Sequence, residues 1–467
     1  MLSRAFGGVM ARAATKRKAN SKKVRSQKKV FRRVYAENFR GFAKIDFQIK
    51  DVTFVVGDNS SGKTSLIYLL SVIASRDFGN QFDIFSDSSP LSTIDDVRSP
   101  FVTGDKTVVG FSLVRRHFDD SGEERASVEA RFAEYTHSGK HECVATKIGA
   151  LRDKQARFVL RKNRTFYRKN VTIEEGAVEK KIESFFEGWS DESLSYNRYI
   201  SFPPTLEISG EHWSVVLVDV DKEKNSISMP YMRTTPLVNF IQYGPMRISP
   251  EHVYSGHAIP QDHRGAHTPA MLKKIYDSRK TSKSSRIIEK INKFGVQSGM
   301  FDQVIVNSYN KRDSKAPFGI HIEKRGHIFS IDEVGYGVSQ VLPIIIDAIR
   351  SIGSSDTMIS IQQPELHLHP KAQAAFGELV YELAGEGIAF FIETHSDYII
   401  DRFRYCLFKS KKEAGFESGI LLSENTPEGN RISEINIDGN GGVSDAPSGY
   451  REFFLQEDNR LFDMLWR

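Results

Sequence analysis

Cysteine is scarce in this chain, and long apolar runs are missing from it. Cys143 and Cys406 are the only cysteines in 467 residues, so neither a disulfide framework nor a thiolate zinc site is available. That usage fits a reducing cytosol. No apolar stretch approaches the roughly 20 residues that span a bilayer, which disfavours a transporter with its own membrane segment. We therefore expect a cytoplasmic protein with no membrane partner.

Acidic residues are absent from the first 36 positions, where twelve Lys and Arg side chains lie. The rest of the chain holds 53 Lys and Arg against 59 Asp and Glu, so the net charge of +6 hides a mildly acidic body. With few large apolar side chains, residues 1–29 are expected to form a disordered basic arm attracted to polyanions. The same composition is typical of a transit peptide, and the native start could instead be Met10.

The most specific pattern in the chain is a glycine-rich loop at residues 57–64. It follows the apolar run 53–56 and leads into residues 65–70, whose pattern is helical. Glycines after a buried strand let backbone N–H groups turn toward a triphosphate, and the dipole of the next helix adds positive potential. Lys63 would reach the β- and γ-phosphates, and the Thr64 hydroxyl would ligate Mg²⁺. The predicted nucleotide-binding residues here are Gly57, Asn59, Ser60, Ser61, Gly62, Lys63, Thr64 and Ser65.

A second set of patterns lies near the C-terminus. A Gly/Ser turn at residues 335–339 opens an apolar helix and presents N–H groups and a hydroxyl suited to a γ-phosphate. Residues 357–361 predict a buried strand that ends in two glutamines, and residues 388–392 predict another that leads to His395. The carboxyl ends of such strands carry the metal and water chemistry of α/β nucleotide folds. His395 could therefore hydrogen-bond a γ-phosphate or position the attacking water.

Together these motifs resemble those of the prokaryotic ABC-type ATPases related to the overcoming-lysogenization-defect (OLD) proteins, cousins of RecF and SMC heads. Residues 243–247 and 447–454 match as well, so the likeness runs from about residue 30 to the end. It implies an α/β fold, namely an ABC-type P-loop ATPase head with a mixed sheet. A β-rich and then helical insertion at 111–325 would separate an N-terminal lobe with the Walker A loop, 30–110, from a C-terminal lobe, 326–467.

The resemblance also implies roles for single residues. Gly335, Gly337 and Ser339 would form the signature that contacts ATP held by another subunit, and His395 would be the switch histidine. Two nucleotides between two heads require a homodimer or a larger homo-oligomer. The implied cofactors are ATP and Mg²⁺.

One departure from the family pattern affects the predicted mechanism. Relatives usually carry an acid at the position of Gln362, where a carboxylate holds the magnesium shell, and an acid or Gln at that of Gln363. A neutral amide cannot act as a general base and replaces a carboxylate poorly beside a divalent cation. The predicted metal residues are thus Thr64 and Gln362, and the predicted catalytic residues are Glu365, Gln363 and His395, with Glu365 the only nearby acid. We expect firm ATP binding and slow or absent hydrolysis.

Many members of this group carry a C-terminal Toprim nuclease, whose metal site needs clustered acids. Only 72 residues follow His395, so nuclease activity is not expected here. Stand-alone ATPases of this type occur in Septu-like, retron-associated and PARIS-like antiphage systems beside a separate nuclease or toxin. The resemblance therefore favours a nucleotide-controlled sensor or scaffold in bacterial antiphage defence. The alternatives are a RecF- or SMC-like DNA-repair ATPase and a structural subunit locked by ATP.

Two basic stretches are candidates for DNA or RNA contacts. Residues 152–169 hold eight basic residues interleaved with Phe158, Phe166 and Tyr167, which would suit phosphate contacts and base stacking. A solvated hairpin whose aromatic side chains face the core produces the same spacing. The second stretch, equally ambiguous, comprises Lys273, Lys274, Arg279, Lys280, Lys283 and Arg286.

Overall fold

The computed structural model describes residues 28–75, 78, 97–104, 106–118, 124–136, 143–152, 155–162, 165–172, 199–200, 219–221, 226–228, 238–310, 312–354, 356–410, 415–444, 446–447 and 450. Residues 1–27 of the predicted basic arm and most of the matching segment 447–454 lie outside these residues, while residues 28 and 29, expected to be disordered, begin a strand. Within the range 152–169 the structure describes strand backbone for residues 152, 155–162 and 165–169 but no side chains, so the first basic stretch stays a prediction.

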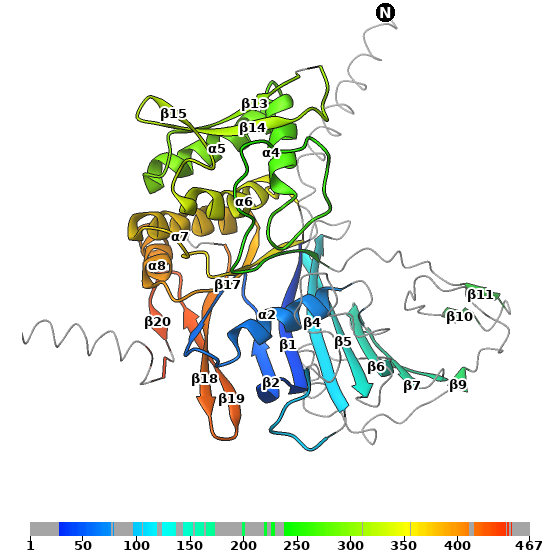
Figure 1. Ribbon diagram of the computed structural model, residues 1–467. Coiled ribbons are helices and arrows are strands. Elements are labelled where there is room, and N and C mark those ends of the chain that lie inside the picture. Colours follow the sequence, from blue (N-terminus) through cyan, green and yellow to red (C-terminus); the bar gives the residue numbers. More distant parts are fainter. Residues whose placement is uncertain are drawn as a thin grey trace, which may run out of the picture.

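A seven-stranded mixed sheet forms the centre of the molecule, in the order β12-β16-β17-β3-β18-β19-β20 (Figure 1). The first five strands run parallel, β19 pairs antiparallel with β18, and β20 pairs antiparallel with β19. These strands are β12 (Asn239–Tyr243), β16 (Thr357–Gln362), β17 (Ala389–Glu393), β3 (Val52–Gly57), β18 (Ser418–Thr426), β19 (Gly429–Ile437) and β20 (Val443–Ser444). The range 111–325, expected as an insertion, thus contributes β12 to the central sheet.

Both faces of the central sheet are buried, which explains the unbroken apolar runs of its strands. Successive side chains point to opposite faces. Along β3, Phe54 joins one apolar cluster and Val55 the other, and along β17, Ile392 and Phe391 divide in the same way. The runs 357–361 and 388–392, which predicted buried strands, are confirmed as β16 and β17.

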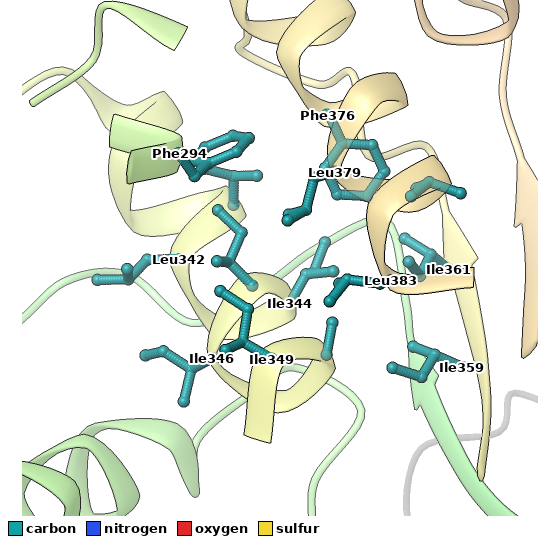
Figure 2. Packing of buried hydrophobic residues seen from close by; sticks show 14 of the residues in the cluster. Phe294, Leu342, Ile344, Ile346, Ile349, Ile359, Ile361, Phe376, Leu379 and Leu383 are labelled. Carbon is teal, nitrogen blue, oxygen red and sulfur yellow. The ribbon is translucent and has the colours of Figure 1, made fainter. Parts of the chain in front are cut away.

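Helices cover one face of the sheet, and a small antiparallel sheet packs above them (Figure 1). Figure 2 shows the apolar contact between α6 and α7, where Ile344 of α6 and Leu383 of α7 lie toward Ile361 of β16. Helix α5 buries Ile287, Ile291 and Phe294, whose spacing places them on one face of the helix. These elements are α4 (Thr268–Asp277), α5 (Ser282–Ser298), α6 (Tyr336–Arg350), α7 (Pro370–Gly385), α8 (Asp397–Ser410), β13 (Gln303–Ser308), β14 (Phe318–Lys324) and β15 (His327–Ser330).

Helix α2 (Lys63–Ala74) lies against the other face, between the central sheet and an antiparallel sheet of order β2-β1-β4-β5-β6-β7-β8-β9. Strands β1 and β2 form an antiparallel hairpin that precedes the loop strand β3. The strands are β1 (Lys28–Phe39), β2 (Phe42–Gln48), β4 (Lys106–Phe118), β5 (Glu124–Thr136), β6 (Cys143–Arg152), β7 (Gln155–Lys162), β8 (Thr165–Thr172) and β9 (Tyr199–Ile200), with β10 (Asp219–Asp221) and β11 (Ser226–Ser228) as a separate pair. Among the described helices, none is long and apolar enough to cross a bilayer.

Candidate nucleotide-binding site

The glycine-rich loop joins the end of β3 to the start of α2, as its sequence predicts. Gly57 has φ +136°, and a Cβ there would lie 1.9 Å from the carbonyl oxygen of Ser423, so only glycine fits. Gly62, with φ +94°, precedes α2 and offers no side-chain acceptor to the first amides of the helix. Those N–H groups and the helix dipole favour an anion at this position.

Residues of the distant β18 hold the loop in shape. The Ser423 hydroxyl donates to the Ser61 carbonyl over 2.6 Å, and Asn425 Nδ2 donates to the Asn59 carbonyl over 3.2 Å. Ser60 in the same loop has a left-handed φ of 62°. No motif in the sequence marked Ser423 or Asn425, because their partners lie more than 360 residues away in the chain.

Lys63 and Thr64 lie at the first turn of α2. Lys63 is buried, and its Nζ donates to the carbonyls of Gly57 and Asp58 over 2.9 and 2.5 Å. Burial lowers the pKa of Lys63, while the charges of Glu393 and Asp58 oppose that shift. Thr64 Oγ1 lies 3.3 Å from both carboxylate oxygens of Glu393. A cation and a hydroxyl thus stand beside a carboxylate that the sequence motifs had not selected.

Strand β17, which ends two residues before His395, is the direct neighbour of the loop strand β3. Glu393 is in register with Val55, and the Thr394 amide donates to the Val55 carbonyl over 3.1 Å. The His395 side chain is exposed. Partial burial of its ring and the charge of Lys63 lower the pKa of His395, against the opposing effect of Glu365. The phosphate loop and the segment that ends in His395 are therefore side by side, with a neutral imidazole favoured near Lys63.

Glu365 holds the segment that follows β17. Its Oε1 accepts from the His395 amide and its Oε2 from the Thr394 hydroxyl, each over 2.7 Å. This brace fixes the backbone on which His395 lies. The catalytic role of Glu365 in polarising water stays a prediction, as does that of His395.

The end of β16 is tied to its neighbours through backbone groups. Gln363, at a left-handed φ of 43°, donates its amide to the Glu393 carbonyl over 2.8 Å. Arg247 is buried and donates Nη2 to the Gln362 carbonyl over 2.6 Å, while its Nε and Nη1 have no hydrogen-bond partner within the described part of the chain. Burial lowers the pKa of Arg247 to about 10, and the charge of Glu365 opposes this. The buried cation Arg247 is therefore bonded to the backbone of the segment that carries the two neutral side chains, Gln362 and Gln363.

The signature turn lies against the loop after β16 of the same chain. A Cβ at Gly337 would lie 2.4 Å from the His367 carbonyl oxygen, and the Tyr336 ring meets the His367 ring edge-on at 5.0 Å. The Ser339 hydroxyl donates to the Tyr336 carbonyl over 2.8 Å. Gly335 precedes α6, with open space where a Cβ would lie. Among the described hydrogen bonds, none joins residues 335–339 to residues 57–65.

The oxygen donors at the end of β17 fit magnesium bound to a nucleotide. No group of three or more His, Cys, Asp and Glu side chains within the described ranges could hold a metal ion. Mg²⁺ on a nucleotide needs no such cage, because phosphates, waters and one or two protein oxygens complete its shell. The Thr64 hydroxyl and the Glu393 carboxylate are hard oxygen donors at one place. A magnesium ion there would neutralise charge on the phosphates.

The phosphate loop, its neighbouring strand with a carboxylate and a histidine, and the helix-covered mixed sheet define a P-loop ATPase of the ABC type. The predicted fold class is thereby confirmed. Residues 52–401 match the family described as "AAA domain, putative AbiEii toxin, Type IV TA system". The chain belongs to this family and carries its ATPase domain.

The individual proteins that this chain resembles share only a short alignment or a low sequence identity with it. The chain is 34% identical over 76 residues to an OLD nuclease of Thermus scotoductus, an alignment that covers 16% of this chain and 14% of that relative. An Smc head from Pyrococcus furiosus, bound to the C-terminal domain of ScpA, has a TM-score of 0.44 and 9% identity, with 94% of this chain and 100% of that one covered. An SMC head from Thermotoga maritima has a TM-score of 0.37 and 13% identity, with 87% and 99% covered.

Proposed function

We propose that this protein binds ATP and Mg²⁺ between two copies of itself and acts as a nucleotide-controlled sensor or scaffold in bacterial antiphage defence, with a separate nuclease or toxin as effector. The observation that supports it is the union of Lys63 and Thr64 with the end of β17 at one edge of the sheet. This edge joins a helix N-terminus, a buried cation and hard oxygen ligands, which suits a magnesium-bound triphosphate.

The position of the signature turn supports a dimer. Within one chain the turn packs against His367, and Gly335, Gly337 and Ser339 make no described hydrogen bond with the phosphate loop. Because the N-terminus of α6 makes no described hydrogen bond with the phosphate loop of its own chain, it is available to bind a phosphate held by another copy. Two heads would then enclose two nucleotides.

The side chains at the end of β16 favour slow hydrolysis, because none of them is a free carboxylate that could act as a general base. Gln362 and Gln363 are neutral, and both oxygens of Glu365 already accept hydrogen bonds. Phosphoryl transfer depends on positioning and on charge stabilisation, so a missing base costs orders of magnitude in rate. Long-lived ATP-bound dimers suit a sensor or scaffold.

The names of the matched relative and of the family are compatible with a defence role, but they name activities rather than this role. The matched relative is named a nuclease, and the family description names a putative toxin of a toxin–antitoxin system. Neither activity has a clustered acidic site in the described part of this chain. A separate effector protein is therefore the simplest source of the toxic step.

The test is ATP binding by a Lys63→Ala variant, measured by isothermal titration calorimetry. Loss of the ammonium beside the phosphates should weaken ATP binding by at least about tenfold. Lys274→Ala, at an exposed position of α4, is the matched control and should bind as the parent does. Equal affinities in the parent and Lys63→Ala would refute the site.

A RecF- or SMC-like repair role is the second candidate. Lys274, Arg279, Lys280 and Lys283 are exposed at the turn between α4 and α5 and form no described salt bridge, whereas Lys273 is buried and paired with Asp277. Such a patch suits phosphate contacts. ATP-dependent binding to duplex ends that is lost when these four residues become Ala would favour this role.

A further inference from the structure

The acid missing from the end of β16 has a counterpart one strand closer to the phosphate loop. The sheet order places β17 between β16 and β3. Glu393 is the last residue of β17, in register with Gln362 on one side and with Val55 on the other. The carboxyl ends of parallel strands meet at one edge, so Glu393 lies between the neutral amide and the loop strand.

The carboxylate of Glu393 faces the start of α2. Both of its oxygens lie 3.3 Å from Thr64 Oγ1, and the residue is only 5% exposed. Burial raises the pKa of Glu393, while the charge of Lys63 and the Thr64 hydroxyl act against this shift. A buried carboxylate is costly unless it is paired, and the partners of this one belong to the phosphate-binding residues.

The other acids near the site are engaged elsewhere or exposed. Glu365 uses its two oxygens to hold the segment 394–395. Asp58 lies exposed on the loop itself, and its carbonyl accepts from Lys63. Within the described residues, Glu393 is the acid whose carboxylate contacts the predicted magnesium ligand Thr64.

We propose that Glu393 supplies the carboxylate beside the magnesium of bound ATP, in place of the acid that is absent at Gln362. The carboxylate that relatives carry at the end of β16 is thus provided here from the end of the adjacent strand, β17. This inference rests on the proposed ATP site. It assigns Glu393 to the ion and leaves Glu365 to position His395.

The test compares ATP binding with Mg²⁺ and with EDTA, measured by calorimetry, because this readout does not depend on turnover. Glu393→Gln keeps the size of the side chain and removes its charge. The gain in ATP affinity that Mg²⁺ gives the parent should fall roughly tenfold or more, while binding in EDTA changes little. Glu434→Gln is the control, at an exposed glutamate of β19 that accepts from the Gln48 amide and whose pKa is also raised by partial burial, and it should keep the full gain.

A rescue variant makes the test specific to charge. Gln362→Glu combined with Glu393→Gln returns an acid to the neighbouring strand and should restore part of the magnesium gain. If Glu393→Gln fails to fold, Glu393→Asp, which shortens the reach of the carboxylate toward Thr64, should show the same loss.

The outcomes separate this inference from the proposed function. A parent protein that binds no ATP refutes the proposed function, and the role of Glu393 falls with it. A parent that binds ATP, with the same magnesium gain in Glu393→Gln, overturns only the role of Glu393. Loss of the gain in Glu365→Gln instead of Glu393→Gln would also overturn it and would assign the ion to Glu365.

Discussion

A buried carboxylate links the helical layer to the central sheet. Asp347 of α6 is fully buried and accepts hydrogen bonds from the Tyr243 hydroxyl and from His267 Nε2, each over 2.8 Å. Arg350 lies 3.3 Å away. Burial alone would raise the pKa of Asp347, but the hydrogen bond and charge of His267, with Arg350 and Tyr243, lower it. The ionised form is thus stabilised by three partners from three segments.

Replacing Asp347 with Asn should lower the free energy of unfolding by about 3–5 kcal/mol, because buried partners would lose the charge they enclose. Urea unfolding followed by circular dichroism measures this loss. Asp401→Asn breaks an exposed pair with Arg404 and should cost less than about 1 kcal/mol. Losses of equal size in the two variants would contradict the role of the cluster.

The contribution of Asp347 should also depend on pH. Its folded pKa lies below the usual 3.8, so the unfolded chain takes up the proton first as the pH falls. The stabilisation is fully present above the unfolded pKa and is lost as the pH falls through the folded pKa. The difference in urea midpoint between the parent and Asp347→Asn should therefore be constant near neutral pH and shrink below about pH 4. A difference that grows with acid would contradict this sign.

Among the elements outside the predicted nucleotide motifs, β18 contacts the phosphate loop directly. It pairs in parallel with β3 over residues 418–423 and ends beside the phosphate loop. The Ser423 hydroxyl, fully buried, donates to the Ser61 carbonyl. The loop is consequently shaped from outside its own motif, by a strand that lies more than 360 residues further along the chain.

Ser423→Ala should destabilise the protein by about 1–3 kcal/mol, since the Ser61 carbonyl would lose its partner, and should weaken ATP binding. Hydrogen exchange of residues 57–62 and calorimetry measure the two effects. Thr426→Ala removes a similar hydroxyl-to-carbonyl bond, to Gly429, in the same hairpin. If ATP affinity falls equally in Thr426→Ala, the effect does not come from the loop.

For the whole molecule, the signature turn and the phosphate loop need not meet within one chain. The turn packs on His367, and a Cβ at Gly335 would meet nothing within 4 Å. A side chain at position 335 is therefore compatible with the fold of one copy. In the proposed dimer it would lie against the triphosphate of the other.

Gly335→Glu should keep ATP binding and thermal stability but abolish ATP-dependent dimerisation, because a carboxylate would meet the phosphates at short range. Light scattering after size-exclusion chromatography, with and without ATP and Mg²⁺, measures the mass. Gly385→Glu, at the end of α7 with equally open space, should dimerise as the parent does. Dimers of Gly335→Glu would place the signature away from the interface.

Several parts of the structure could be predicted from short segments. Gly57, Gly62 and Lys63 mark the loop because only glycine fits its backbone and because a strand precedes it and a helix follows. The spacing of Ile287, Ile291 and Phe294 predicts the buried face of α5. In each case the local structure depends on residues within about one helical turn or one loop.

The local sequence alone settled the phosphate loop, the strand-forming runs and the amphipathic helix, since glycine conformation and side-chain periodicity act over a few residues. The tertiary structure decided that β12 joins the central sheet, that Ser423 shapes the loop, and that Glu393 faces Thr64. Strand order brings together groups that are hundreds of residues apart, and it is set by packing both faces of the sheet against two apolar layers. No short segment carries that information.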